Sequence, residues 1–134
     1  MNAESLYRRL VAVIDVPVIE TSEIWTKGIF IQERGQEPRI YIKEELEQAE
    51  KLQVLLYEYV HYLHTAKYYE QESRAEAEFI AESAVFFILR EFNLTPKVTP
   101  AQAEFTKDAD RIKHLSTKIQ QISEEIIALL HGHD

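Results

Sequence analysis

The chain has 134 residues, of which 46% are apolar and 28% are charged, and its formal net charge is −8. This length suits one hydrophobic core, and the absence of cysteine excludes disulfides and thiolate metal sites. The acidic charge argues against direct nucleic-acid binding, which needs Lys and Arg against the phosphates. No apolar run is long enough to span a membrane and no signal-peptide pattern opens the sequence, so we expect a cytoplasmic protein without membrane contact.

The N-terminal third predicts a helix followed by a small antiparallel sheet. Residues 5–14 carry apolar side chains at helical spacing, and Pro17 ends that pattern. The segments 28–32 and 39–43 are rich in β-branched and aromatic residues and are separated by turn-forming residues, which predicts a hairpin. Residues 16–20 are a weaker candidate for a third strand.

The rest of the sequence predicts three helices, over residues 44–67, 73–93 and 100–131. Ser73 is the expected N-cap of the second, with Glu76 as its capping-box partner. The third is expected to start at Thr99-Pro100 and to close near Gly132. The fold class is therefore α+β and mainly helical, with an N-terminal helix, a sheet of two or three strands, a motif helix, a Glu-bearing helix and a long C-terminal helix.

The first of these three helices has two distinct faces. Its core face is expected to hold Leu52, Leu55, Leu56, Tyr59, Val60 and Leu63. The opposite face carries a stripe of four residues that we call the Tyr/His stripe: Tyr57, His61, His64 and Tyr68. Glu58 lies to one side of this stripe. The stripe is either an interaction groove or site, or a solvent-facing surface that happens to hold two histidines.

The next helix holds two carboxylates near its apolar arc. Glu78 falls within the arc that Val85 and Leu89 define, and Glu82 lies at its edge, whereas Glu76 projects to the polar side. A carboxylate among apolar residues is costly unless it is paired or binds a cation. We therefore expect Glu78, and then Glu82, to point inward, or else to pair with basic or Tyr side chains at the rim of the core.

These two helices together resemble a known family. The run Tyr57-Glu58-Tyr59-Val60-His61 and the Glu/Ala-rich segment 76–84 resemble the ImmA/IrrE-like zinc metallopeptidases, which are common in phages and mobile elements, over about Leu6–Leu94. Members carry His-Glu-x-x-His on one helix and a Glu ligand on the next. The resemblance implies a water-activating role for Glu58, a zinc-ligand role for His61, and an acidic-ligand role for Glu78 or Glu82.

The chain departs from this family at the first ligand, where Tyr57 replaces histidine. A phenol is a poor zinc ligand unless it loses its proton, and a catalytic zinc needs three protein ligands. The resemblance therefore implies a degenerate scaffold: a non-catalytic protein-binding or inhibitory factor of phage or mobile-element type, without a cofactor, that binds a protein partner through the Tyr/His stripe. The alternative is an active zinc-dependent peptidase with an altered ligand set, in which His64 replaces the missing imidazole.

The C-terminal helix lies beyond the resemblance, which divides the chain into a metallopeptidase-like domain, 1–94, and a helical segment, 95–134. Its apolar residues repeat in heptads, with Phe105, Ile112, Ile119 and Ile126 at one position and Leu115, Ile122 and Leu129 at the other. This seam either packs on the domain or forms a homodimer, and a coiled-coil oligomerisation module is a further alternative. The charged residues beside the seam, Lys118 among them, are expected on a solvated face.

Overall fold

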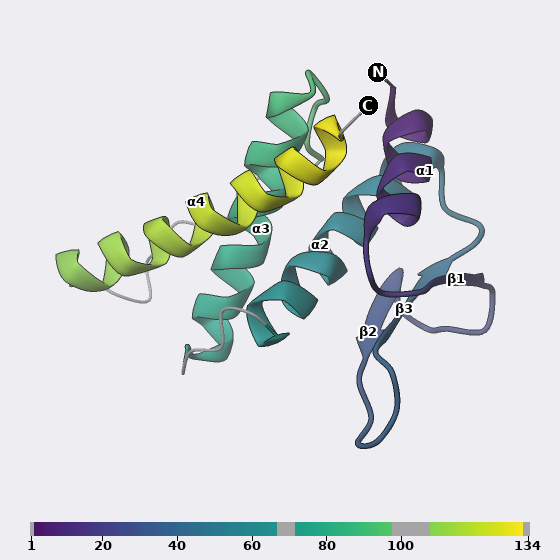
Figure 1. Ribbon diagram of the computed structural model, residues 1–134, viewed down its shortest axis with the longest axis horizontal. Coiled ribbons are helices and arrows are strands. Elements are labelled where there is room, and N and C mark those ends of the chain that lie inside the picture. The colour runs from purple at the N-terminus through teal and green to yellow at the C-terminus, as the bar shows by residue number, and fades with distance from the viewer. Residues whose placement is uncertain (1, 67–71, 98–107, 133–134) are drawn as a thin grey trace.

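The computed structural model describes residues 2–66, 72–97 and 108–132. Its elements are α1 (Ala3–Val13), β1 (Val18–Thr21), β2 (Gly28–Ile31), β3 (Arg39–Lys43), α2 (Gln48–Ala66), α3 (Arg74–Glu91) and α4 (Ala109–His131). In Figure 1, α2 runs through the middle of the molecule, between the sheet on one side and α3 with α4 on the other. The expected α+β class and the order of its elements are confirmed.

The three strands form a mixed sheet in the order β1-β3-β2. β2 and β3 pair antiparallel as the predicted hairpin, and the weaker third-strand candidate forms β1. The expectation of a purely antiparallel sheet is wrong, because β1 pairs parallel with β3. The hairpin reverses the chain after β2 and brings β3 back between the other two strands, so β3 runs in the direction of β1.

The core lies between the sheet, α2 and the helices beyond it. Ile40 and Ile42 of β3 are fully buried and point to the side of the sheet that α2 covers. All six residues predicted for the core face of α2 are buried, which confirms that face. Burying a large aliphatic side chain contributes about 2 kcal/mol, so this row of leucines fixes how α2 is rotated against the sheet.

The start of α3 is set by the predicted capping box. The side chain of Ser73 accepts a hydrogen bond from the backbone N–H of Glu76 at 3.1 Å, and the Glu76 carboxylate accepts one from the backbone N–H of Ser73 at 2.8 Å. The two residues satisfy each other's backbone donors, as the sequence predicted.

The last helix begins later than expected. Asp108 is the N-cap of α4, and its side chain accepts hydrogen bonds from the backbone N–H groups of Asp110 and Arg111. The prediction of one continuous helix from residue 100 is therefore wrong at Asp108, because the backbone of Asp108 is extended and α4 begins after it. The expected start at Thr99-Pro100, and Phe105, lie outside the described residues. Gly132 closes α4 with a positive φ of 71°, as predicted.

The apolar side of α4 packs against the chain itself. The central seam residues Leu115, Ile119, Ile122 and Ile126 are all buried in the same core as α2 and α3. The Arg9 guanidinium of α1 also donates to the carbonyl of His131 at 3.1 Å and ties the end of α4 to the N-terminal helix. These central seam residues therefore pack within the chain.

Within the described part of the chain, no helix has both the length and the apolar character that crossing a bilayer would require.

Candidate functional site

The Tyr/His stripe of α2 faces α3 and meets the carboxylate of Glu78. The Tyr57 hydroxyl donates a short hydrogen bond to Glu78 Oε2, and His61 Nε2 lies 3.7 Å from Glu78 Oε1. The rings of Tyr57 and His61 are in edge-to-face contact, with centroids 4.6 Å apart. Glu78 thus faces the stripe as expected, but its side chain is 43% exposed, so it pairs at the rim of the core and does not point into it.

The protonation of this trio follows from its surroundings. Burial raises the pKa of the Tyr57 hydroxyl, and the hydrogen bond to Glu78 and the nearby carboxylates raise it further. Burial lowers the pKa of the His61 imidazole, against the opposite effect of the Glu78 charge. At neutral pH the phenol therefore keeps its proton and the imidazole is neutral, so the Glu78 carboxylate carries the charge of the trio.

These donors do not fit the zinc centre that the family resemblance implies. Such a centre needs three protein donors around one point with a fourth position open. His61 and Glu78 supply two, but the third position holds a phenol whose proton is directed at Glu78 and whose raised pKa opposes metal coordination. Among residues 2–66, 72–97 and 108–132, no three histidine or acidic side chains are placed to hold one metal ion.

A cavity of about 400 Å³ opens beside this trio, between α2, α3 and the start of β2. Its polar lining comes from Lys27, Glu50, Gln53, Tyr57, Glu58 and Glu82, and its apolar wall from Gly28, Val54 and Val85. Gly28 is required for this packing, because a Cβ there would lie 2.3 Å from a methyl carbon of Val54. Of the two candidate acidic ligands, Glu82 thus lines the cavity, whereas Glu78 contacts the Tyr/His stripe.

Glu58 is the most perturbed acid of the cavity. Its carboxylate accepts a hydrogen bond from the backbone N–H of Phe30, on the edge of β2. Burial raises the pKa of Glu58 to about 7, and the Glu78 charge acts in the same direction, while the bond from Phe30 opposes both. A carboxyl that titrates near neutral pH in a cavity is typical of a functional site.

Replacing Glu58 with glutamine is expected to stabilise the protein above about pH 7 and to leave its stability unchanged below about pH 4.5. The unfolded carboxyl titrates near 4.5 and the folded one at about 7, so ionisation opposes folding. This cost is absent below about pH 4.5 and complete above about pH 7. Glu58→Gln should therefore raise the free energy of unfolding by up to about 3 kcal/mol at about pH 8.

Urea unfolding of this variant near pH 4 and pH 8 checks the prediction, with the exposed Glu45→Gln as control. An equal effect of Glu58→Gln at both pH values, or no effect at pH 8, would contradict the assigned protonation.

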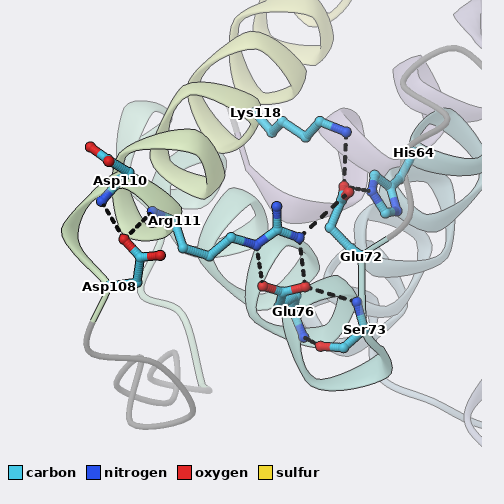
Figure 2. Close-up of polar contacts among 8 residues, drawn as sticks. All are labelled: His64, Glu72, Ser73, Glu76, Asp108, Asp110, Arg111 and Lys118. Atoms are coloured by element: carbon cyan, nitrogen blue, oxygen red, sulfur yellow. Dashed lines mark hydrogen bonds and ion pairs between the residues drawn. The ribbon is translucent and has the colours of Figure 1, made fainter.

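His64 belongs to a different group from Tyr57 and His61. Its Nε2 lies 2.6 Å from Glu72 Oε1, and Lys118 of α4 donates to the same oxygen at 2.8 Å (Figure 2). The Glu72 side chain is only 1% exposed. The structure therefore does not bring His64 to the position of the missing imidazole, because its ring nitrogen contacts Glu72. Tyr68, the last member of the stripe, lies outside the described residues.

Glu76 is buried, so the expectation that it projects to a polar surface is wrong. Its carboxylate accepts two hydrogen bonds from the Arg111 guanidinium, at 2.5 and 2.7 Å, because α4 covers this side of α3 (Figure 2). These bonds, with that from the Ser73 N–H, lower the pKa of Glu76 to about 2. Arg111 also lies 4.0 Å from Glu72. His64, Glu72, Glu76, Arg111 and Lys118 form what we call the α4 ion-pair cluster.

Lys118 was expected on a solvated face but is 5% exposed. It lies three residues after Leu115 and four before Ile122, so helical spacing places it on the buried side. That spacing was the available signal for its burial. Nothing in the sequence pattern identified Glu72 as its partner, because the two residues are 46 positions apart.

No protein-family model, curated protein or solved structure matches this chain.

Proposed function

We propose that this chain is a non-catalytic, cytoplasmic protein-binding factor on a zinc-peptidase-like scaffold, and that the cavity between α2, α3 and β2 is its recognition site. The observation that carries the proposal is the hydrogen bond from Tyr57 to Glu78, which joins two positions that the resemblance assigns to metal ligands. By the same resemblance, we propose an inhibitory or recruiting role of phage or mobile-element type, exerted without a cofactor.

The cavity favours a cationic side chain of the partner. Three acidic side chains line it, those of Glu50, Glu58 and Glu82, against one ammonium group, that of Lys27, which is paired with Glu50. Because the pKa of Glu58 is about 7, Glu58 is about half ionised at neutral pH and gains charge as the pH rises. Val54 and Val85 form an apolar wall along which an aliphatic stem can lie. A cavity of about 400 Å³ admits one long side chain, so an Arg or Lys of the partner fits both its size and its charge.

Titration with N-acetylarginine amide, followed through amide chemical shifts, tests this assignment. The arginine probe should shift the signals of Gly28, Val54 and Val85, and the neutral probe N-acetylnorleucine amide should not. Glu82→Gln should weaken arginine binding by about threefold to tenfold, because it removes one carboxylate from the cavity.

Glu91→Gln is the matched control for this titration, since Glu91 is an exposed carboxylate of the same helix. Arginine binding that is unchanged by Glu82→Gln, or equal shifts with the norleucine probe, would refute the cavity as a cation-recognising site.

The alternative of an active zinc peptidase with an altered ligand set draws support from Glu58, whose pKa of about 7 suits a general base. The edge of β2 argues against it, since a peptide can bind there as an added strand only through free backbone groups. The N–H of Phe30 already donates a hydrogen bond to Glu58, and the C=O of Gly28 accepts one from the Thr26 hydroxyl at 2.9 Å. Side chains of the same protein therefore occupy both backbone groups that an added strand would need.

The coiled-coil module has less support, because the central seam residues of α4 are buried within the chain. A homodimer through the rest of α4, where Ile112 is 37% exposed, stays a prediction.

A further inference from the structure

The sheet has a second face, opposite α2. Side chains alternate along a strand, so Arg39, Tyr41 and Lys43 of β3 point away from the face of the buried Ile40 and Ile42. No described helix covers this outer face (Figure 1). It lies on the other side of the sheet from the cavity, so nothing that follows depends on the function proposed for the cavity.

An apolar row crosses the middle of this outer face. The strand register pairs Tyr41 with Ile19 of β1 on one side and with Ile29 of β2 on the other. Both isoleucines are 39% exposed, and Ile31 lies next along β2 on the same face. These side chains form one contiguous apolar row, which a partner could cover.

The charges on the outer face are cationic. Arg39 and Lys43 are its charged strand residues, in a chain whose net charge is −8. Arg39 Nε donates to the Tyr41 hydroxyl at 3.0 Å, and its guanidinium lies over the Tyr41 ring, with Glu33 of the hairpin turn 3.4 Å away. The carboxylate of β1, Glu20, points instead to the helices, where it bonds Tyr7 and Lys51.

Trp25 lies in the connection that borders one end of the sheet. It is 99% exposed and lies in the connection from β1 to β2. That connection passes the end of β3, because Thr21 pairs with Lys43 and Gly28 pairs with Ile42. A fully exposed tryptophan is rare on a soluble surface unless it serves as a contact residue, and tryptophan is enriched among the residues that dominate binding energy.

We propose that the outer face of the sheet is a docking surface for an acidic amphipathic helix of a protein partner. A helix packs naturally on an open sheet face, and its apolar side would cover the row of Ile19, Tyr41 and Ile29. Its carboxylates would pair with Arg39 and Lys43 at the two ends of β3. A second copy of the chain would place the same cations opposite each other at this face.

Fluorescence anisotropy with two labelled helical peptides tests this proposal. Both carry leucine along one face, and their flanks carry glutamate in one peptide and lysine in the other. The acidic peptide should bind at least about tenfold more tightly than the basic one. Trp25 is the only tryptophan, so the indole emission should shift to the blue as the peptide covers it.

Two variants locate the binding site and one controls for it. Ile29→Glu and Lys43→Glu should each weaken binding of the acidic peptide by about tenfold. Lys43 lies at the end of β3 and is partly exposed, so Lys43→Glu tests binding without disturbing the fold. Phe87→Glu changes an aromatic residue that is 55% exposed on α3 and should leave binding unchanged.

Four results would overturn the proposal: no binding of the acidic peptide, equal binding of the basic peptide, indifference to both sheet variants, or tighter binding of an oligothymidine. A dimer of the free chain that Ile29→Glu dissociates would assign the face to a second copy and overturn it as well.

Discussion

Replacing Glu72 with alanine should lower the free energy of unfolding by about 3 kcal/mol. The Glu72 carboxylate is 1% exposed and binds both His64 and Lys118. Its removal takes away the carboxylate to which the Lys118 ammonium donates, and this ammonium is 5% exposed beneath α4. Urea denaturation at neutral pH measures the loss.

A double-mutant cycle separates this cause from simple loss of packing. Lys118→Met added to Glu72→Ala should restore part of the stability, because the second change removes the buried ammonium from which the first took the Glu72 carboxylate. Glu91→Ala, at an exposed site on α3, should change stability by less than about 0.5 kcal/mol. A loss below about 1 kcal/mol for Glu72→Ala, or strictly additive losses in the cycle, would contradict the ion-pair account.

Tyr57→His should give this scaffold a zinc site. The new imidazole would lie one helical turn before His61, opposite Glu78, which completes two imidazoles and a carboxylate. Ligand binding to the folded state alone adds about 2.7 kcal/mol of stability when free zinc is a hundredfold above Kd. Thermal unfolding of the variant with and without zinc, followed by chelator, measures this gain.

Two further variants show whether the metal uses the proposed donors. Tyr57→Phe removes the phenol hydroxyl without adding an imidazole and should gain no zinc-dependent stability. Glu78→Gln in the Tyr57→His background should lose most of the gain, because it removes the third donor. Equal zinc binding by Tyr57→Phe and Tyr57→His, or none by Tyr57→His, would show that these positions do not converge on one metal.

The parts of the fold that depend on neighbouring residues could be predicted from the sequence. The core face of α2 follows from helical spacing, and the capping box at Ser73 and Glu76 joins residues three positions apart. The direction of β1 could not be predicted in this way, because its pairing with β3 joins segments more than 20 residues apart. No local pattern distinguishes a parallel neighbour from an antiparallel one for so short a strand.

The environment of α3 depended on the position of α4, which no local pattern gives. Glu76 looks polar when α3 is considered alone, yet Arg111, 35 residues later, covers it. Helical spacing within α4 places Lys118 on the buried side, but it does not identify the partner Glu72, which precedes α3. Spacing within one helix can indicate that a charged residue is buried, but it does not identify a partner that is distant in the sequence.

The candidate site could be predicted in part. The i, i+4 spacing of Tyr57 and His61, and the place of Glu78 on the next helix, brought those three residues to one point. The direction of His64 depended on Glu72, which no motif marked. Trp25 lies in a connection between strands, where no periodic pattern indicates exposure.

The most direct test of the central claim is the zinc content and zinc affinity of the untagged wild-type protein. We expect no stoichiometric zinc after purification and no zinc binding in competition with a chelating indicator. The reason is that Tyr57 stands at the position of the third metal ligand and its hydroxyl donates a hydrogen bond to Glu78. One zinc per chain, removed by chelator together with a peptide-cleaving activity, would contradict a non-catalytic binding protein and establish the peptidase alternative.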